Sequence, residues 1–206
     1  MNNNHPLHEF FNLQIVSCSN LSPSNDIHLK STIFDSDRCH KIRFCEFEVK
    51  NKFYAESLVI YPNFCYETPI FGTEYINFGS KKYFAAIDFH PITESNSYLS
   101  YMDMFPDKKP IKSKFYDLSK FFSEKLWVRK KSHDFYNEYQ IMLKCFLYQY
   151  KKCLYAEKEK VVSFEKNHAE YNFHMKNKDP ALGILKSYFG ENFAKEYIDD
   201  FLFSNK

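Results

Sequence analysis

Two carboxylic acids in this 206-residue chain stand beside sequence features that could give them a part in proton transfer. Glu74 follows the run Phe71-Gly72-Thr73, and Asp179 precedes Pro180 at the start of an apolar stretch. A carboxyl group among apolar side chains has a raised pKa, which lets it donate a proton near neutral pH. The chain can supply such surroundings, because 19% of its residues are aromatic.

Each acid also has an ordinary structural explanation. A strand glutamate such as Glu74 is often simply exposed to solvent. An Asp-Pro pair is a common helix start, in which the aspartate caps the first turn and stabilises it by about 0.5–2 kcal/mol. A capping Asp179 would be ionised, whereas a proton donor must at some stage be neutral. A third acid, Asp88, lies near the end of an apolar run and suits a turn or a buried hydrogen bond better than catalysis.

Metal chemistry has little support in the sequence. The six cysteines form no CxxC pair and show no zinc-ligand spacing. The eight histidines contain no zinc-protease motif, and His168 and His174 are six positions apart, which does not place them on one helical face. We therefore expect reduced thiols and no bound metal.

Composition argues against two further classes of protein. The 28 basic and 26 acidic residues give a formal charge of +2, which is far from the charge of a dedicated nucleic-acid binder. The first residues resemble no signal peptide, and no later run reaches the roughly 18 apolar residues of a membrane span. We expect one cytoplasmic domain over residues 1–206, monomeric and without a nucleic-acid or membrane partner.

The first half of the chain predicts strands. Lys50-Asn51-Lys52 is short and polar, as a hairpin connection should be, and the stretch SCSNLSPSND over residues 17–26 predicts a loop. Apolar runs bounded by turn-forming residues predict strands at residues 28–34, 42–49, 53–61 and 82–89.

The second half predicts helices. Apolar residues recur at three- and four-residue steps from Phe135 to Leu154. Asp179-Pro180 should start a second helix that ends at Gly190, and a last helix should run from about Asn192 to Phe203. Strands followed by helices predict an α+β fold, a three-layer α/β/α sandwich with a central antiparallel sheet.

Four segments, in this order, resemble the ferredoxin-dependent bilin reductases. The fourth, which contains Asp179, carries the most specific likeness, and the viral members that form phycoerythrobilin are the most similar. The segments are LVIYP leading to TPIFGTE (58–74), KKYFAAIDFHP (81–91), FFSEKLWVR (121–129) and KDPALGILKSYFGE (178–191).

The resemblance implies a reaction as well as a fold. Members of this family bind no metal, flavin or nicotinamide; single electrons arrive from reduced [2Fe–2S] ferredoxin, and the bilin is itself the redox centre. The substrate would be biliverdin, reduced through radical intermediates, with protons supplied by the protein.

The resemblance also gives the two acids their expected roles. Glu74 takes the place of a central aspartate that donates a proton, although its extra methylene moves the carboxyl group by roughly one bond length, and catalytic geometry is sensitive at about 1 Å. Asp179 matches the aspartate that acts as a second proton donor in members that reduce the A-ring vinyl system.

Five other residues are expected to bind the substrate. Arg43 and Arg129 are candidates to pair with the two propionates, because guanidinium binds carboxylate in a bidentate geometry; each could instead be a solvated arginine at a strand end. Ser57 falls where phycocyanobilin-forming relatives carry a histidine, and Phe71 and Ile87 belong to the strands that form one wall of the bilin pocket.

Basic clusters at residues 81–82, 108–114 and 129–131 could form a docking face for an acidic ferredoxin. The leading functional prediction is four-electron reduction of biliverdin to phycoerythrobilin, in a cytoplasm that for a viral enzyme would be that of a cyanobacterial host. Three alternatives stay open: a two-electron reductase that forms 15,16-dihydrobiliverdin or phytochromobilin, a non-catalytic bilin carrier or lyase-like protein, and a generic interaction domain.

Overall fold

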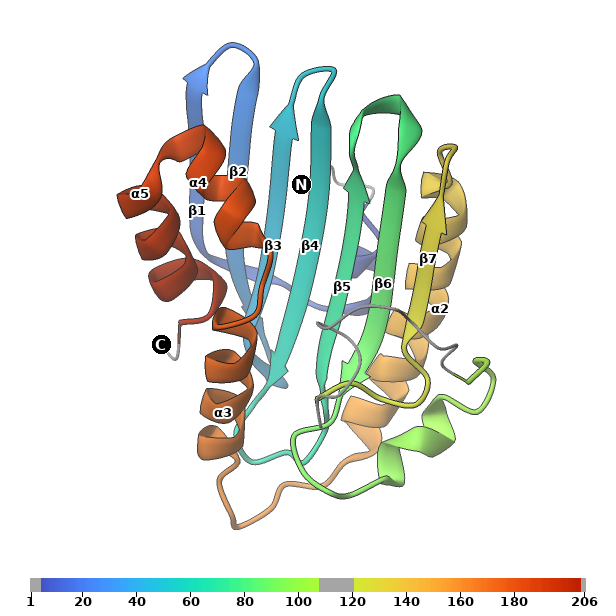
Figure 1. Cartoon of the computed structure of the whole chain (residues 1–206). Coiled ribbons are helices and arrows are strands. Elements are labelled where there is room, and N and C mark those ends of the chain that lie inside the picture. The colour runs from blue at the N-terminus through green and yellow to red at the C-terminus, as the bar shows by residue number, and fades with distance from the viewer. Residues whose placement is uncertain (1–4, 108–120, 205–206) are drawn as a thin grey trace.

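A seven-stranded antiparallel sheet forms the centre of the protein in a computed structural model that describes residues 5–107 and 121–204. Each strand pairs with the next in the chain, so the sheet is a continuous meander (Figure 1). The strands are β1 (Gln14–Ser24), β2 (Ile27–Ser36), β3 (Cys39–Val49), β4 (Phe53–Pro62), β5 (Ile70–Asn77), β6 (Tyr83–His90) and β7 (Trp127–Lys131).

The predicted β3–β4 hairpin is confirmed. Its turn places Asn51 in the left-handed region with φ of 61°, a conformation that asparagine tolerates better than most residues. The predicted loop over residues 17–26 is wrong, since most of it lies in β1. Every residue of β1 is exposed, so this strand shows no alternation of apolar and polar residues from which it could be recognised.

Helix α2 (Tyr136–Ala156) covers one face of the sheet, as its apolar periodicity predicts. Its Leu143, Phe146 and Tyr150 are completely buried. The Tyr150 ring lies 5.2 Å from the ring of Phe71 on β5 and 5.2 Å from that of Phe89 on β6. The short helix α1 (Leu7–Phe10) joins this layer by contacts with α2.

The α2 face also buries a carboxylate. Glu56 on β4 is 2% exposed and accepts hydrogen bonds from the hydroxyls of Tyr54, Tyr136 and Tyr139 at 3.2, 2.9 and 3.2 Å. His5 Nε2 lies 3.5 Å from the same carboxylate. Burial pushes the pKa of Glu56 upward, but His5 and the tyrosine hydroxyls outweigh this effect, so the pKa is lowered.

The opposite face is covered by α3 (Glu165–Lys176), α4 (Ala181–Phe189), α5 (Glu191–Tyr197) and a π-helical turn (Ile198–Leu202) (Figure 1). Gly190, with φ of 85°, ends α4 as predicted. Helix α3 was not predicted, because its apolar residues are few and exposed Phe173 interrupts their pattern. Layers on both faces confirm the α/β/α sandwich.

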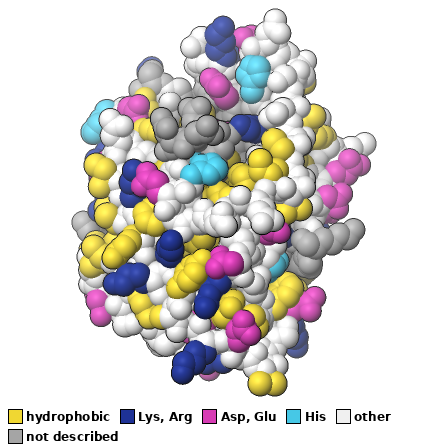
Figure 2. Space-filling view, turned by 180° about the vertical axis from the view of Figure 1, so that it is seen from behind, with side chains coloured by type: hydrophobic (Ala, Val, Ile, Leu, Met, Phe, Trp, Pro, Cys, Tyr) yellow, Lys and Arg dark blue, Asp and Glu magenta, His cyan; other side chains and the backbone are white. Residues whose placement is uncertain are grey.

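The surface seen from behind carries acidic and basic side chains interspersed with apolar ones (Figure 2). Short 3-10 turns at Gly79–Lys81 and Ser97–Tyr101 complete the described elements. Among the helices in the described ranges, none is both long and apolar enough to cross a membrane.

Candidate active site

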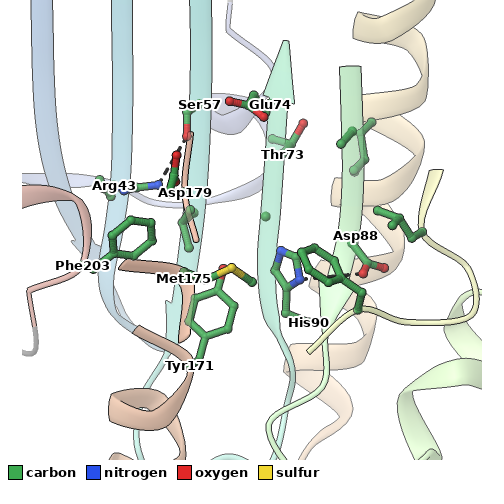
Figure 3. Close-up of a pocket in the computed structure, with 16 residues that line it drawn as sticks. Arg43, Ser57, Thr73, Glu74, Asp88, His90, Tyr171, Met175, Asp179 and Phe203 are labelled. Carbon is green, nitrogen blue, oxygen red and sulfur yellow. Dashed lines mark hydrogen bonds and ion pairs between the residues drawn. The ribbon is translucent and has the colours of Figure 1, made fainter. Parts of the chain in front are cut away.

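A pocket lies between the sheet and the layer of α3 to α5 (Figure 3). It encloses about 80 Å³, and a second pocket of about 470 Å³ adjoins it, with Glu74 in the wall of both. The first pocket is lined by Arg43, Ser57, Val59, Gly72, Thr73, Glu74, Ala86, Ile87, Asp88, His90, Phe122, Leu126, Tyr171, Met175, Asp179 and Phe203.

Strand alternation decides which side chains reach this pocket. On β5, Gly72 and Glu74 face the pocket, whereas Phe71 and Tyr75 belong to the core under α2. Glu74 is paired in register with Ser57 on β4 and with Ala86 on β6, in the middle of the sheet. The sheet therefore presents one acid from a central strand to the space beneath the helices.

Asp179 enters the pocket from the other layer, in the connection between α3 and α4. Its side chain is half-buried, and Oδ1 accepts a hydrogen bond of 2.7 Å from the Ala181 N–H. Burial raises the pKa of Asp179, against the opposing influence of this hydrogen bond and of the positive charge of Arg43. Capping and a raised pKa therefore coexist at Asp179: one oxygen caps α4 while the carboxyl group favours protonation more than a free aspartate does.

Arg43 is not a solvated strand-end residue, because it is 3% exposed. Nη1 donates to the Leu202 carbonyl at 2.7 Å, and Nη2 donates to Ser57 Oγ at 3.3 Å, as the dashed line in Figure 3 shows. Nε has no hydrogen-bond partner among the described residues. Arg43 therefore lines the pocket as an enclosed guanidinium, and its pairing with a propionate stays a prediction.

The side chains of three other predicted substrate contacts point away from the pocket or lie outside it. Phe71 is completely buried between Phe89 and Tyr150 on the α2 face. The side chain of Ile87 belongs to the same core, so alternation leaves its backbone toward the pocket. Arg129 extends over the ring of Trp127 at the edge of the sheet, 5.1 Å from its centroid, and lines neither pocket. Phe71 and Arg129 thus lie outside the lining of both pockets, whereas Ile87 contributes to the first, and substrate binding by these residues stays a prediction.

Gly72 makes room for a histidine. A Cβ at this position would lie 2.2 Å from His90 Nε2, so only glycine allows the imidazole to pack against β5. His90 Nδ1–H donates to the Phe121 carbonyl at 2.9 Å. Burial lowers the pKa of His90 to about 4, so the ring is neutral and Nε2 carries a lone pair.

Asp88 has the buried hydrogen bonds that its sequence position predicts. It is 1% exposed; Oδ2 accepts from the Ser123 N–H at 2.8 Å, and Oδ1 accepts a short hydrogen bond from the Ser123 hydroxyl. These bonds fix the segment after residue 120 to the end of β6.

Comparison with known sequences decides the family. The sequence model of the ferredoxin-dependent bilin reductases matches residues 11–204. The chain belongs to this family.

Two relatives of this bilin reductase carry the name 15,16-dihydrobiliverdin:ferredoxin oxidoreductase. The one from Nostoc punctiforme is 26% identical over 202 residues, which cover 88% of this chain and 80% of the relative. The other, from a strain of Prochlorococcus marinus, is 28% identical over 201 residues, which cover 88% of this chain and 82% of the relative. The predicted special likeness to viral members stays a prediction.

The fold is also that of a solved structure, phytochromobilin synthase from tomato in complex with biliverdin. The TM-score is 0.79 at 18% identity, and the superposition covers 97% of this chain and 79% of the other. The shared fold agrees with the sandwich described above, and the family makes the chain an enzyme that reduces bilins with ferredoxin as electron donor.

The second pocket of this bilin reductase is apolar inside and basic at its rim. Ile76, Phe84 and Pro180 contribute apolar surface, while the exposed Lys82, Lys130 and Lys178 surround it; its other lining residues are Glu74, Phe78, Tyr83 and Lys131. Two of the predicted basic clusters, at residues 81–82 and 129–131, thus contribute to this rim. The cluster at 108–114 lies outside the described residues.

Sequence reasoning missed several pocket residues of the reductase. Tyr171 and Met175 lie one turn apart on α3, the helix that was not predicted, and Phe203 follows the π-helical turn. His90 could have been found, because it has the same strand parity as Asp88. No three His, Cys, Asp or Glu side chains come together as a metal site in the ranges 5–107 and 121–204.

Proposed function

We propose that this bilin reductase reduces biliverdin to phycoerythrobilin in four one-electron steps, as a monomer, with Glu74 and Asp179 as proton donors. Electrons come from reduced [2Fe–2S] ferredoxin, and the protein itself holds no redox group. The observation that carries the proposal is that Glu74 from the sheet and Asp179 from the helical layer line the same pocket.

The chemistry requires acids at two places. Each pair of electrons added to the bilin is accompanied by two protons, and a conjugated tetrapyrrole accepts an electron more easily when it is protonated. The raised pKa of Asp179 favours the protonated form that a donor needs. Its Oδ1 remains occupied by the Ala181 N–H, so Oδ2 is the oxygen that delivers the proton.

The two adjoining pockets suit a long flat substrate better than either pocket does alone. A bilin would extend from Arg43 and Asp179, past Glu74, into the apolar pocket between β5, β6 and Pro180. The first pocket must widen to admit the bilin, and the flexible side chain of Met175 can change rotamer to make room. The biliverdin bound by the tomato protein of the same fold supports biliverdin as the ligand.

The positions of the cations assign the polar ends of the substrate. Exposed Lys82, Lys130 and Lys178 can pair with propionates at low desolvation cost. The buried Arg43 and Ser57 suit an uncharged lactam oxygen, which a guanidinium N–H can bind. Acidic ferredoxin would approach the same lysine rim, where attraction between opposite charges speeds association.

Anaerobic incubation with biliverdin, ferredoxin and a reducing system, followed by product chromatography, tests the proposal. Glu74→Gln should bind biliverdin with the wild-type absorbance shift but lose turnover by about 10²–10⁴-fold, the range for a general acid. Glu48→Gln, on an exposed strand glutamate, is the matched control. Wild-type turnover in Glu74→Gln would remove Glu74 from the mechanism.

A second candidate function is favoured by the relatives. Their name, 15,16-dihydrobiliverdin:ferredoxin oxidoreductase, suits a two-electron enzyme that stops at that compound. Accumulation of 15,16-dihydrobiliverdin by the wild-type protein with excess electron donor would establish this function instead. Bound but unchanged biliverdin would indicate a carrier.

A further inference from the structure

One nitrogen of His90, in the wall of the substrate pocket, has no hydrogen-bond partner among the described residues. The side chain is 6% exposed, and Nε2 is the ring atom that stands closest to the Cβ position of Gly72. Unlike the unpartnered Nε of Arg43, this Nε2 is not closed off by protein atoms. A polar atom in a buried side chain is normally satisfied by a partner, so a molecule bound in the pocket can supply the missing one.

The surroundings of His90 fix its proton on the other ring nitrogen. Nδ1 lies 2.9 Å from the Phe121 carbonyl oxygen and 3.7 Å from Asp88 Oδ2, and both of these oxygens are acceptors. The hydrogen bond made by one ring nitrogen sets the state of the other, so Nε2 carries the lone pair. Burial lowers the pKa of His90 to about 4, which keeps the ring neutral near pH 7. Nε2 is therefore an acceptor and supplies no proton.

Two aromatic rings hold the imidazole in this orientation. The ring centroids of Phe122 and Tyr171 each lie 5.2 Å from that of His90, with Phe122 edge-on and Tyr171 tilted. In Figure 3 a dashed line joins one nitrogen of His90 to Asp88, and the other nitrogen lies on the side of Asp179. The acceptor is thus preorganised for a ligand that enters between the sheet and the helices.

We propose that His90 Nε2 accepts a hydrogen bond from a ring N–H of the bound bilin and so determines how the bilin lies over β5. The inference rests on the proposed function. The ring N–H groups are the donors of biliverdin, because its propionates are ionised near pH 7 and its lactam oxygens only accept. An oxygen of the substrate placed at Nε2 would meet a lone pair, so this point of the pocket favours an N–H.

The position of this acceptor among the other pocket groups gives the substrate a direction. Gly72 and Glu74 are two positions apart on one face of β5, so their Cα atoms lie roughly 7 Å apart. Arg43, Val59 and Gly72 are paired in register across β3, β4 and β5, so the donors of Arg43 come from two strands away. A bilin ring that donates to His90 over Gly72 therefore lies next to Glu74, while the side of Arg43 is left for an oxygen of the substrate.

A pair of amide variants separates the two ring nitrogens. The amide of asparagine reaches the place of Nδ1 but not that of Nε2, whereas the amide of glutamine reaches the place of Nε2 but not that of Nδ1. Absorbance titration with biliverdin should give an affinity about 10-fold lower for His90→Asn, because a buried N–H of the bilin loses its acceptor. His90→Gln, whose Oε1 accepts, should recover most of that affinity. If His90 acted only through its bond to Phe121, the order would be reversed, and the reverse order or two equal affinities would overturn the proposal.

The wild-type protein provides a second measurement that needs no substitution. In ¹⁵N spectra of histidine-labelled protein, the Nε2 resonance of His90 should move when biliverdin is added, and the Nδ1 resonance should move less, since Phe121 keeps its hydrogen bond. The exposed His133, which lines neither pocket, is the control and should stay in place.

An unmoved Nε2 resonance in protein whose absorbance shows bound biliverdin would overturn the proposal. If the Nε2 resonance moves but the wild-type protein reduces no bilin, the proposed function fails while the hydrogen bond to His90 is supported. The two failures are therefore distinct.

Discussion

Two carboxyl groups, Glu56 and Asp179, lie on opposite faces of the sheet and differ in what surrounds them. Glu56 has three tyrosine hydroxyls and His5 within reach and a lowered pKa. Asp179 has one backbone N–H and the influence of Arg43, and its pKa is raised. Burial acts upward on both, so the number of donors decides the direction.

The difference teaches how one fold can keep one acid ionised and another ready to donate. On the α2 face, Glu56 connects β4 with α2 through hydrogen bonds from tyrosine hydroxyls, and these donors together with His5 stabilise its charge. The pocket face leaves its acid with few donors, which costs stability and makes proton transfer possible.

The largest effect should come from the pocket acid. Asp179→Asn keeps the helix cap, because asparagine caps as well as aspartate, but cannot donate the proton. We expect the reduction that leads beyond 15,16-dihydrobiliverdin to slow by about 10²–10⁴-fold, seen as accumulation of that intermediate by chromatography. Phycoerythrobilin formed at the wild-type rate would contradict the role of Asp179.

Replacement of the buried carboxylate on the opposite face, Glu56, should lower the stability of the fold. Glu56→Gln removes a charge that accepts from three hydroxyls, and we expect the free energy of unfolding at pH 7 to fall by about 3 kcal/mol in urea titrations. The contribution of Glu56 is present above its unfolded-state pKa of about 4.3 and is lost as pH falls through its lower folded pKa. The deficit should therefore shrink in acid, whereas a constant deficit would contradict the charge argument.

Gly72→Ala tests the close contact at the pocket floor. The new methyl would collide with the His90 ring, and overpacking of this kind costs about 2 kcal/mol of unfolding free energy. Bilin affinity should fall as well, measured by absorbance titration, because His90 lines the pocket and a displaced ring would change its shape. Gly183→Ala, on α4 with nothing within 4 Å of the new methyl, is the control and should be neutral or stabilising.

The smallest expected effect is an increase in stability, caused by replacement of Asp179. A raised folded pKa means that Asp179 costs stability as pH rises above its unfolded value of about 3.9, and the cost is complete above the folded pKa. At pH 7 the free energy of unfolding of Asp179→Asn should therefore exceed that of wild type by about 0.5–1 kcal/mol, seen as a higher unfolding temperature. This gain should vanish near pH 3. A loss of stability at pH 7 would show that Asp179 is held as a satisfied carboxylate.

Helix α2 could be predicted because one of its faces is buried and the other is exposed, which gives its apolar residues a helical period. The central strands could be predicted because they are buried on both faces and therefore form apolar runs bounded by turn-forming residues. Strand β1 has no buried face, and α3 contributes few apolar residues, so neither leaves a clear period. For these two elements the tertiary arrangement decides the structure.

Strand parity explains which predicted site residues reach the pocket. Phe71 is three positions from Glu74 and Ile87 is one from Asp88, so in each strand an odd separation puts the two side chains on opposite faces. This rule was available in the sequence. The burial of Arg43 was not, because it depends on the Leu202 carbonyl, 159 positions away.

The meander of the sheet has a consequence for synthesis of the chain. Strands β1 to β6 end at His90, whereas α2 begins at Tyr136 and the layer over the pocket begins with α3 at Glu165. A nascent chain therefore carries six pairing strands with two uncovered apolar faces while more than half of the 206 residues are still to be made. We expect this interval to be the time at which the protein depends most on chaperones, and slow translation through the helices to increase aggregation.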